Sequence, residues 1–552
     1  MSGRRKASST PSSLLSTSAM MAAGTLVSRV TGFLRAVLIF AAIGKSLNAE
    51  VFTLSNTIPN ALYILVAGGI FNVVLVPQLV RAMRNDPDGG DAYANRIITL
   101  GLLVLAAATV VLVVAVPVLV RLVFDADLFD PQNSGARESA YALMRYCMPQ
   151  VFFYGAFVLV GQVLNARERF GPMMWAPIVN NVVSCGVLFA YIGLYGSSNE
   201  AGGFSVPEEL LLGWGSTLGI ALQAAVLVPY LRAAGFRFRP RLDFRGVGLG
   251  HTLRLGLWTL FFIIANQIAF FVVNRVASGS ATTAKETGGE AAGATVYQFA
   301  FLVSQVPHGI ITVSIVTATM PMLSRLAADG LREDVRGELN RSMRLVLSAI
   351  VPIAVAVACL GQALATVTAS YGGTSGDTRL IGLTIMSFAP GMVLFSVHYL
   401  MLRGFYAMEN TRTPFLVQIW LSGTNIALAI VLTSLVGSAL VSTVLALSYG
   451  GAYLVGSVIS TTLLSRRVGR ILDARTLSYL FRLAVACVFA AAAMVGTIGA
   501  FEAAGMGVHH VRNALLVLAV GGPLGAGVYL LAARLLRISE VTALVGVVLR
   551  RR

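Results

Sequence analysis

The stretch IITLGLLVLAAATVVLVVAVPVL, residues Ile97–Leu119, contains no charged side chain along its whole length. A helix of about 20 apolar residues crosses the hydrocarbon core of a bilayer, which is about 30 Å thick. Comparable runs recur along the chain, which has 552 residues, 56% of them hydrophobic and 12% charged. Soluble domains carry about 25% charged residues. The composition therefore excludes a soluble enzyme, a disordered chain and a secreted disulfide scaffold, and it predicts an all-α polytopic membrane protein.

Apolar runs of this length predict about fourteen membrane spans. The expected spans are Ala19–Ile43, Thr53–Val80, Ile97–Leu119, Tyr141–Leu164, Met173–Leu194, Leu210–Leu231, Leu255–Val276, Val296–Met320, Arg344–Thr366, Ile381–Leu402, Phe415–Val436, Ala439–Leu464, Leu483–Ala500 and Ala514–Ala533. The longest basic loop follows the sixth span and divides the chain. The expected parts are a disordered cytoplasmic tail (1–18), an N-lobe of six spans (19–232), a basic cytoplasmic loop (233–248), a C-lobe of six spans (249–465), and two further helices with a basic tail (466–552).

Charged residues between the spans alternate in sign from loop to loop. One set of loops is rich in arginine: Arg81, Arg84, Arg167, Arg169, Arg232, Arg237, Arg239, Arg241, Arg245, Arg325, Arg332, Arg336, Arg466, Arg467 and Arg470. The alternate loops are acidic: Asp125, Asp127, Asp130, Glu200, Glu208, Glu209, Glu286, Glu290 and Asp377. Because positively charged loops stay in the cytoplasm, both termini are predicted to be cytoplasmic.

The net charge of +17 could also suggest a nucleic-acid partner. Nucleic-acid binding would gather the basic residues on one water-facing surface, whereas here they lie in short loops between apolar spans. We therefore expect no nucleic-acid partner. The loop RFRPRLDFRG (Arg237–Gly246) alternates basic and aromatic residues, which would suit lipid headgroups, but topology alone also explains its charge.

No motif of an enzyme, metal site or cofactor site occurs in the sequence. There is no P-loop, GxSxG or HExxH motif and no pair of carboxylates within a span, so the chain is not expected to be an enzyme. The four cysteines lie in apolar stretches without CxxC spacing: Cys147, Cys185, Cys359 and Cys487. We therefore expect small core residues rather than disulfides or metal ligands, and no cofactor.

The first span, SAMMAAGTLVSRVTGFLRAVLIF (Ser18–Phe40), carries two arginines at bilayer depth. At 100° per residue, Ser28 and Arg35 share one stripe of the helix, and Arg29 lies about 120° round from it. An intramembrane charge is costly and marks a functional site by default. The alternative is that both arginines snorkel to the interface or bind helix ends. Because Arg29 lies about ten residues inside the span, we favour a hydrated cavity.

The second span has a polar face in its first half. That face carries three candidate binding residues: Asn56, Asn60 and Tyr63. Pro59 removes a backbone hydrogen bond in the same turn, and a broken helix needs a polar cavity or tight packing around it. Gly68 and Gly69 follow and would allow another helix to approach closely.

Further polar side chains lie inside later spans: Gln267, Asn274, Arg275, His308, His398 and Arg403. A lone intramembrane histidine is more often a hydrogen-bonded core residue than a proton relay. Arg403 lies near the cytoplasmic end of its span, where interfacial placement competes with ligand binding. Since guanidinium groups match phosphate oxygens bidentately, these arginines favour an amphiphile with an anionic head, moved between leaflets.

Several motifs, in order, resemble the MurJ (MviN) family of bacterial lipid II flippases, which belongs to the multidrug/oligosaccharidyl-lipid/polysaccharide exporter superfamily. They are SRVTGFLR (Ser28–Arg35), IPN (Ile58–Asn60), VP (Val76–Pro77), LNARERFGPMMWAP (Leu164–Pro177) with Asn181, NQIAFFVVN (Asn266–Asn274) and RGFYAMENTRTP (Arg403–Pro414). Lipid II is the undecaprenyl-pyrophosphate-linked peptidoglycan precursor. The resemblance covers nearly the whole chain.

The resemblance implies a fold of two six-helix lobes with two C-terminal helices that form a groove for the lipid tail. It also implies alternating access in the bacterial cytoplasmic membrane, with lipid II as substrate, and cell-wall synthesis and division proteins as possible partners. Arg29 and Arg35 match the two arginines of the SRVTGFLR motif that are required for function in the family. Gly32 of the same motif, and Glu50 at the acidic position before the second span, are expected to be structural or gating residues, as are Pro59, Gly68 and Gly69.

The sequence departs from the family pattern at some positions. Some relatives have an arginine, a glutamate and another arginine where this chain has Tyr63, Gly68 and Leu302. Arg275 or Arg403 is therefore expected to supply the missing charge. Some relatives also bind sodium through carboxylates of the second lobe, but this chain has no Asp or Glu in its seventh, eleventh or twelfth span. Others continue into a cytoplasmic pseudokinase region and an extracellular domain. We expect this chain either to lack these regions or to be truncated before them.

Two other superfamily functions and one non-transport function compete with lipid II transport. A cation-coupled drug exporter would have carboxylates rather than arginines in its cavity, and a polysaccharide-lipid flippase of the same superfamily is the other transport alternative. A membrane scaffold for wall-synthesis enzymes gives no reason for Arg29 and Arg35 to lie so deep in the first span.

Overall fold

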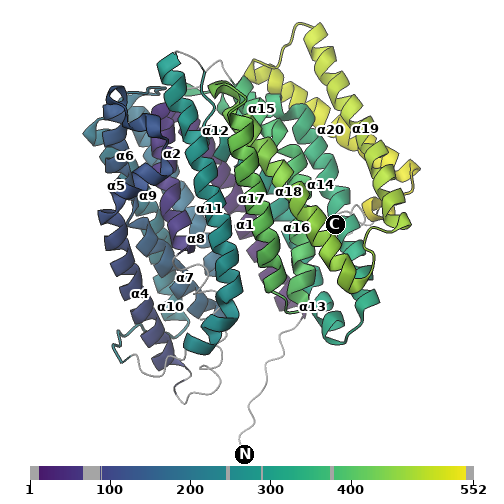
Figure 1. The fold of residues 1–552 in the computed structure, drawn as a ribbon, viewed down its shortest axis with the longest axis horizontal. Helices are drawn as coiled ribbons and strands as arrows, with labels where there is room; N and C mark the ends of the chain where they lie inside the picture. Colours follow the sequence, from purple (N-terminus) through teal and green to yellow (C-terminus); the bar gives the residue numbers. More distant parts are fainter. Residues whose placement is uncertain are drawn as a thin grey trace, which may run out of the picture.

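Figure 1 shows a computed structural model, which describes residues 11–65, 88, 90–243, 249–287, 290–372 and 378–542. Within these ranges the chain is helical and contains no strand, as the composition predicted. Thirteen helical segments are long and apolar enough to span a membrane. The expected span Thr53–Val80 begins within a described helix and continues outside the described residues, where Gly68 and Gly69 lie. The all-α polytopic fold is thus confirmed.

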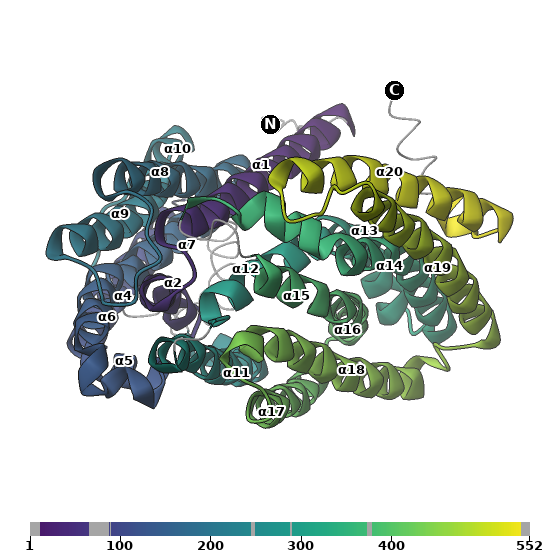
Figure 2. The same ribbon diagram turned by 90° about the horizontal axis from the view of Figure 1, so that it is seen from above.

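Helices of the first half pack as one group, the N-terminal bundle (Figures 1 and 2). Its elements are α1 (Pro11–Ile43), α2 (Leu47–Tyr63), α4 (Asp91–Val114), α5 (Val116–Val123), η3 (Ala126–Phe129), η4 (Pro131–Asn133), α6 (Ser134–Cys147), α7 (Gln150–Ala166), α8 (Gly171–Tyr195), α9 (Val206–Ala225) and α10 (Leu227–Ala233). Local signals set several boundaries. Ser205 and Glu208 form a capping box at the start of α9, and Pro172 and Pro207 occupy first-turn positions, where no backbone N–H is needed.

The second half forms the C-terminal bundle, with two helices packed on its outer side (Figure 2). Its elements are α11 (Leu249–Thr287), α12 (Ala294–Pro307), η5 (His308–Thr312), α13 (Val313–Ala328), α14 (Arg332–Ala369), α15 (Arg379–Ser387), α16 (Ala389–Ala407), α17 (Arg412–Thr433), η7 (Ser438–Leu440) and α18 (Val441–Val468), followed by α19 (Ala474–Ala503) and α20 (Val511–Leu535). Tyr529 of α20 donates a hydrogen bond to the carbonyl oxygen of Ser348 in α14 at 2.6 Å. Arg344 and Glu540 form an ion pair at 2.9 Å that also anchors the C-terminal segment.

Among the described residues, the acidic turns between α5 and α6 and between α8 and α9 lie at one end of the molecule, the acidic end, and the arginine-rich turns between α7 and α8 and between α13 and α14 lie at the other, the basic end (Figure 1). Hydrogen bonds join the two bundles at the acidic end. The backbone N–H of Asp125 donates to the Ser278 hydroxyl at 2.9 Å, and Gln132 donates to Glu286 at 2.6 Å. One hydrophobic core includes buried residues of both bundles, whereas the other cores each lie within one half of the chain. The bundles are therefore held together at the acidic end.

Candidate functional site

A cavity of about 570 Å³ lies between the two bundles. Four of the predicted site residues line it: Arg29, Arg35, Asn56 and Asn60. Its other polar walls come from α2, α7, α8, α9, α12 and η5: Thr53, Thr57, Tyr154, Asn180, Ser184, Ser216, Thr295, Gln298, Gln305 and His308. Among the described residues, no Asp or Glu lines this space. The two guanidinium groups therefore make it a cationic cavity.

The two arginines approach the cavity from different turns of α1. Arg29 is exposed, and Arg35 is half-buried with a buried Nε atom that has no hydrogen-bond partner. Within the described ranges neither guanidinium forms an ion pair. A buried donor without a partner is costly, because it has lost its bonds to water. An anion in the cavity would give the guanidinium groups that line it an opposite charge as a partner.

Arg29 reaches across to the C-terminal bundle at a break in the eighth span. Helix α12 ends at Pro307, and a single π-helical turn follows from His308 to Thr312. Such turns occur mainly inside α-helices at functional sites. A Cβ atom on Gly309 would lie 3.2 Å from Nη2 of Arg29, so the missing side chain makes room for the guanidinium.

Replacing Gly309 by leucine is therefore expected to push the Arg29 guanidinium out of place and to weaken binding of a diphosphate lipid about tenfold, the effect of roughly one charge-assisted hydrogen bond. Ser314→Leu, on an exposed position of α13 that does not line the cavity, is the matched control. Binding to the protein in nanodiscs measures the effect. Equal affinities for the two variants would contradict the assigned contact.

Asn181 of α8 joins that helix to the SRVTGFLR motif of α1. Its Nδ2 donates to the carbonyl oxygen of Ser28 and to the hydroxyl of Thr31, both at 3.0 Å. A Cβ atom on Gly32 would lie 3.4 Å from the same amide, so Gly32 permits this close packing. Ser28 thus acts here through its carbonyl group and does not line the cavity, whereas Gly32 has a packing contact.

A ladder of amides and hydroxyls connects the bundles along the cavity wall. Gln150 donates to Asn56 at 3.0 Å within the N-terminal bundle. Thr57 donates to Gln298 of α12 at 2.9 Å, and Gln298 donates to Asn274 of α11 at 2.8 Å. Gln298 and Gln305 were not among the predicted site residues, although they lie seven residues apart and so share one face of a helix.

Glu50 joins the bundles at the acidic end. This fully buried carboxylate lies in the first turn of α2, before the apolar part of that helix. It accepts hydrogen bonds from the backbone N–H groups of Ala294 at 2.7 Å and Thr295 at 2.9 Å. It therefore caps the start of α12 in the other bundle. Burial raises the pKa of Glu50 to about 7, although the two N–H groups act in the opposite direction. A Cβ atom on Gly293 would lie 2.8 Å from its Oε1.

Three predicted binding residues do not line the cavity and instead contact other parts of the protein. Tyr63 is buried and stacks on Tyr154, with ring centroids 5.9 Å apart. Gln267 is buried and donates to the carbonyl oxygen of Ala61 at 2.7 Å. That carbonyl lies near Pro59, and α2 continues through this proline without the predicted break.

Arg275 donates to carbonyl oxygens at the end of α5, including that of Phe124 at 2.6 Å. Cations are favourable at a helix C-terminus, which explains this position. Arg275 thus does not supply the charge that the family pattern lacks, and the apolar Leu302 lines the cavity.

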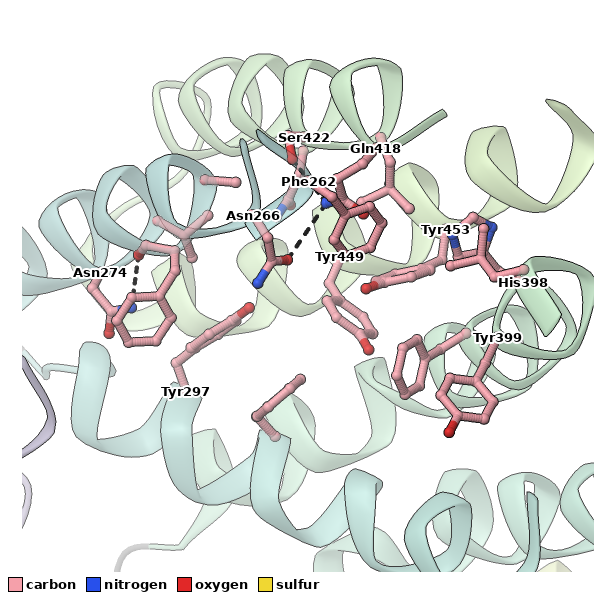
Figure 3. Close-up of a pocket in the computed structure, with 18 of the residues that line it drawn as sticks. Phe262, Asn266, Asn274, Tyr297, His398, Tyr399, Gln418, Ser422, Tyr449 and Tyr453 are labelled. Atoms are coloured by element: carbon pink, nitrogen blue, oxygen red, sulfur yellow. Dashed lines mark hydrogen bonds between the residues drawn. The ribbon is translucent and has the colours of Figure 1, made fainter. Parts of the chain in front are cut away.

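Arg403 lies in a second cavity, of about 440 Å³, inside the C-terminal bundle. Its guanidinium lies over the ring of Tyr399, 4.6 Å from the centroid, and hydrogen-bonds to the hydroxyl group of that residue. This aromatic cavity is shown in Figure 3. The sequence placed Arg29 and Arg403 in one site, but the structure places them in two adjacent cavities.

An apolar groove of about 380 Å³ lies between α14, α19 and α20. Its lining is almost entirely aliphatic: Pro352, Ile353, Ala356, Val357, Leu360, Leu364, Ala490, Met494, Leu518, Gly522, Gly525, Ala526, Tyr529 and Leu530. A groove of this composition suits a hydrocarbon chain.

Comparison with known proteins gives consistent matches. A family model described as lipid II flippase MurJ matches residues 39–516. The probable lipid II flippase MurJ of Rhizobium tropici is 27% identical over 416 residues, which are 74% of this chain and 73% of that relative. A solved lipid II flippase MurJ in an inward closed conformation has a TM-score of 0.69 and 18% identity, covering 94% of this chain and 99% of the other. A MATE protein in complex with MaL6 has a TM-score of 0.56 and 12% identity, covering 81% of this chain and 96% of the other.

The two structural likenesses show the fold, and the family model shows the family, since it covers most of the chain. The many apolar helices together with the family indicate a multi-pass inner-membrane protein. The resemblance carried by the motifs is therefore confirmed, and this chain belongs to the lipid II flippase MurJ family.

Proposed function

We propose that this protein moves lipid II from the inner to the outer leaflet of the cytoplasmic membrane by alternating access. The observation that carries the proposal is the pair Arg29 and Arg35. Among the described residues, no carboxylate lines the cavity that they face, and neither arginine has an ion-pair partner. A diphosphate offers each guanidinium two oxygens in the geometry that it prefers.

The head group enters from the basic end, which the positive-inside rule assigns to the cytoplasm together with both termini. The diphosphate binds between Arg29 and Arg35, and neutral polar groups such as Asn56, Asn60 and Gln305 surround it. In this low-dielectric space charge-assisted hydrogen bonds are stronger than in water. The protein lowers the barrier to crossing because it replaces the water shell of the diphosphate.

The polyprenyl tail remains in the bilayer and occupies the groove between α14, α19 and α20. Each buried CH₂ group contributes about 0.8 kcal/mol, so a few isoprene carbons suffice to hold the tail. The tail therefore does not cross the polar cavity.

Filling that groove is expected to slow transport. Gly522 lines the groove and its Cβ position is open, so Gly522→Leu would displace part of an isoprene unit and lower the transport rate about tenfold. Gly527→Leu is a matched control, because Gly527 lies on the same helix with equally open space but does not line the groove. The flipping rate in proteoliposomes measures both variants. Equal rates would place the tail elsewhere.

Release to the outside requires the contact between Glu50 and α12 to open. Rocking of the two bundles would break the two hydrogen bonds of Glu50 and close the basic end. Once the head has left, the cavity keeps the positive charges of Arg29 and Arg35. Moving one charge across the membrane potential is worth about 2.3 kcal/mol per 100 mV, so a negative interior favours the return of the empty cavity.

Proteoliposomes test the function directly. Fluorescent lipid II is placed in both leaflets, and a membrane-impermeant reagent reports the fraction that reaches the outer one. We expect exchange that is faster with the protein than in empty vesicles. If the protein does not accelerate lipid exchange but transports an organic cation in the same vesicles, the drug exporter is favoured. Acceleration also distinguishes the flippase from a scaffold, which moves no lipid.

A further inference from the structure

The aromatic cavity of the C-terminal bundle has a wall chemistry unlike that of the cationic cavity. It lies between α11, α12, α16, α17 and α18 (Figure 3). One side consists of packed rings: Tyr297, Phe301, Phe395, His398, Tyr399, Tyr449 and Tyr453. Tyr449 and Tyr453 are 4.5 Å apart and Phe395 and Tyr453 are 5.0 Å apart, measured between ring centroids. These contacts hold the rings in place as flat apolar surfaces.

The opposite side presents neutral amides with unused hydrogen-bonding capacity (Figure 3). Gln418 donates to Ser422 at 2.9 Å and weakly to Asn266 at 3.4 Å. Asn425 accepts a hydrogen bond from Ser448 at 2.8 Å. Within the described ranges, the NH₂ groups of Asn266 and Asn425 and the carbonyl oxygen of Gln418 have no protein partner. They remain available to a ligand.

The charge of the cavity favours a neutral or anionic ligand over an organic cation. Among the described residues no Asp or Glu lines it, and its one formal charge is the Arg403 guanidinium. The cavity is also adjacent to the cationic cavity, because Phe270, Gln298 and Phe301 line both. A ligand whose diphosphate binds Arg29 and Arg35 would thus bring the group attached to that diphosphate against this wall.

We propose that the aromatic cavity binds an N-acylated sugar ring of the lipid-linked head group. A pyranose has an apolar face of C–H groups that can stack on rings such as Tyr453, and a rim of hydroxyl and acetamido groups that matches the amides of Asn266, Gln418 and Asn425. The volume of about 440 Å³ lies in the range of small-molecule sites. The inference rests on the proposed function, and it divides recognition between a diphosphate site in one cavity and a sugar site in the other.

The test compares three ligands that differ only in the head group: lipid II, the same lipid with the disaccharide but no peptide, and bare undecaprenyl pyrophosphate. Asn266→Leu removes an amide at nearly constant volume, and Tyr453→Leu removes a ring face. Trp420→Leu is the control, because Trp420 is exposed on α17 and does not line the cavity. Affinities are measured with the full chain in nanodiscs, and thermal unfolding of each variant checks that it is folded.

Each cavity variant is expected to bind both sugar-bearing lipids about fivefold more weakly, the effect of about one hydrogen bond or aromatic contact, and to bind the bare pyrophosphate normally. Weaker binding of lipid II alone would identify the peptide as the occupant and overturn the proposal. An equal loss for all three ligands, or no loss, would also overturn it. If the wild type bound none of them better than a neutral polyprenol, the proposed function itself would be wrong.

Discussion

Alanine at Arg29 or Arg35 is expected to lower lipid II transport by about one to two orders of magnitude. Each guanidinium offers charge-assisted hydrogen bonds to a diphosphate, worth about 1.5–3 kcal/mol apiece, and 1.4 kcal/mol corresponds to a factor of ten. Proteoliposomes with fluorescent lipid II measure the rate. The double variant is expected to show no transport above empty vesicles, because no other cation lines the cavity within the described residues.

Two comparisons separate charge from geometry. Lysine at either position keeps the positive charge but loses the planar fork, so Arg35→Lys is expected to fall between the wild type and Arg35→Ala. Arg512→Ala is the matched control, since Arg512 is exposed on α20 and away from the cavity. Normal transport by folded Arg29→Ala and Arg35→Ala proteins would show that these side chains do not hold the substrate.

The depth of a charge in a span proved to be an informative signal in the sequence. Arg29 and Arg35 lie too far inside the first span for a purely topological explanation, and the structure does place them on a cavity. Asn56 and Asn60 face the same cavity, as the helical spacing predicted. Hydropathy alone located thirteen of the expected spans, because the bilayer sets their length.

The contacts of other predicted site residues could not be derived from the sequence. The periodicity of one helix does not reveal which distant segment packs against each of its faces. Tyr63 shares the face of Asn60 in sequence, yet it packs on Tyr154. Arg275 lies in a span but reaches the end of α5, and Arg403 enters a separate cavity. Each outcome depends on how the helices pack against one another, which only the folded structure reveals.

Loss of the Glu50 carboxylate is expected to shift the protein toward states that are open at the acidic end. In Glu50→Ala the N–H groups of Ala294 and Thr295 lose their acceptor, and loss of a helix cap costs about 0.5–2 kcal/mol. The open fraction should therefore rise by about 2- to 30-fold. Spin labels at Glu200→Cys and Glu290→Cys, both exposed at the acidic end of opposite bundles, report the distance between them. An unchanged distance distribution would contradict the gating role.

The same contact should respond to pH with a definite sign. In the closed contact the pKa of Glu50 is about 7, whereas in an open, hydrated state it returns toward 4.5, so protons bind more tightly to the closed state. Closure is therefore most stable at low pH and weakens as pH rises through about 7. Glu50→Gln cannot ionise, so its distance distribution should not change between pH 5 and pH 8, although its single amide oxygen can replace only one of the two carboxylate oxygens that accept the two N–H groups. A wild type that opened on acidification would show that the carboxylate is stabilised in its ionised form by the start of α12, despite its burial.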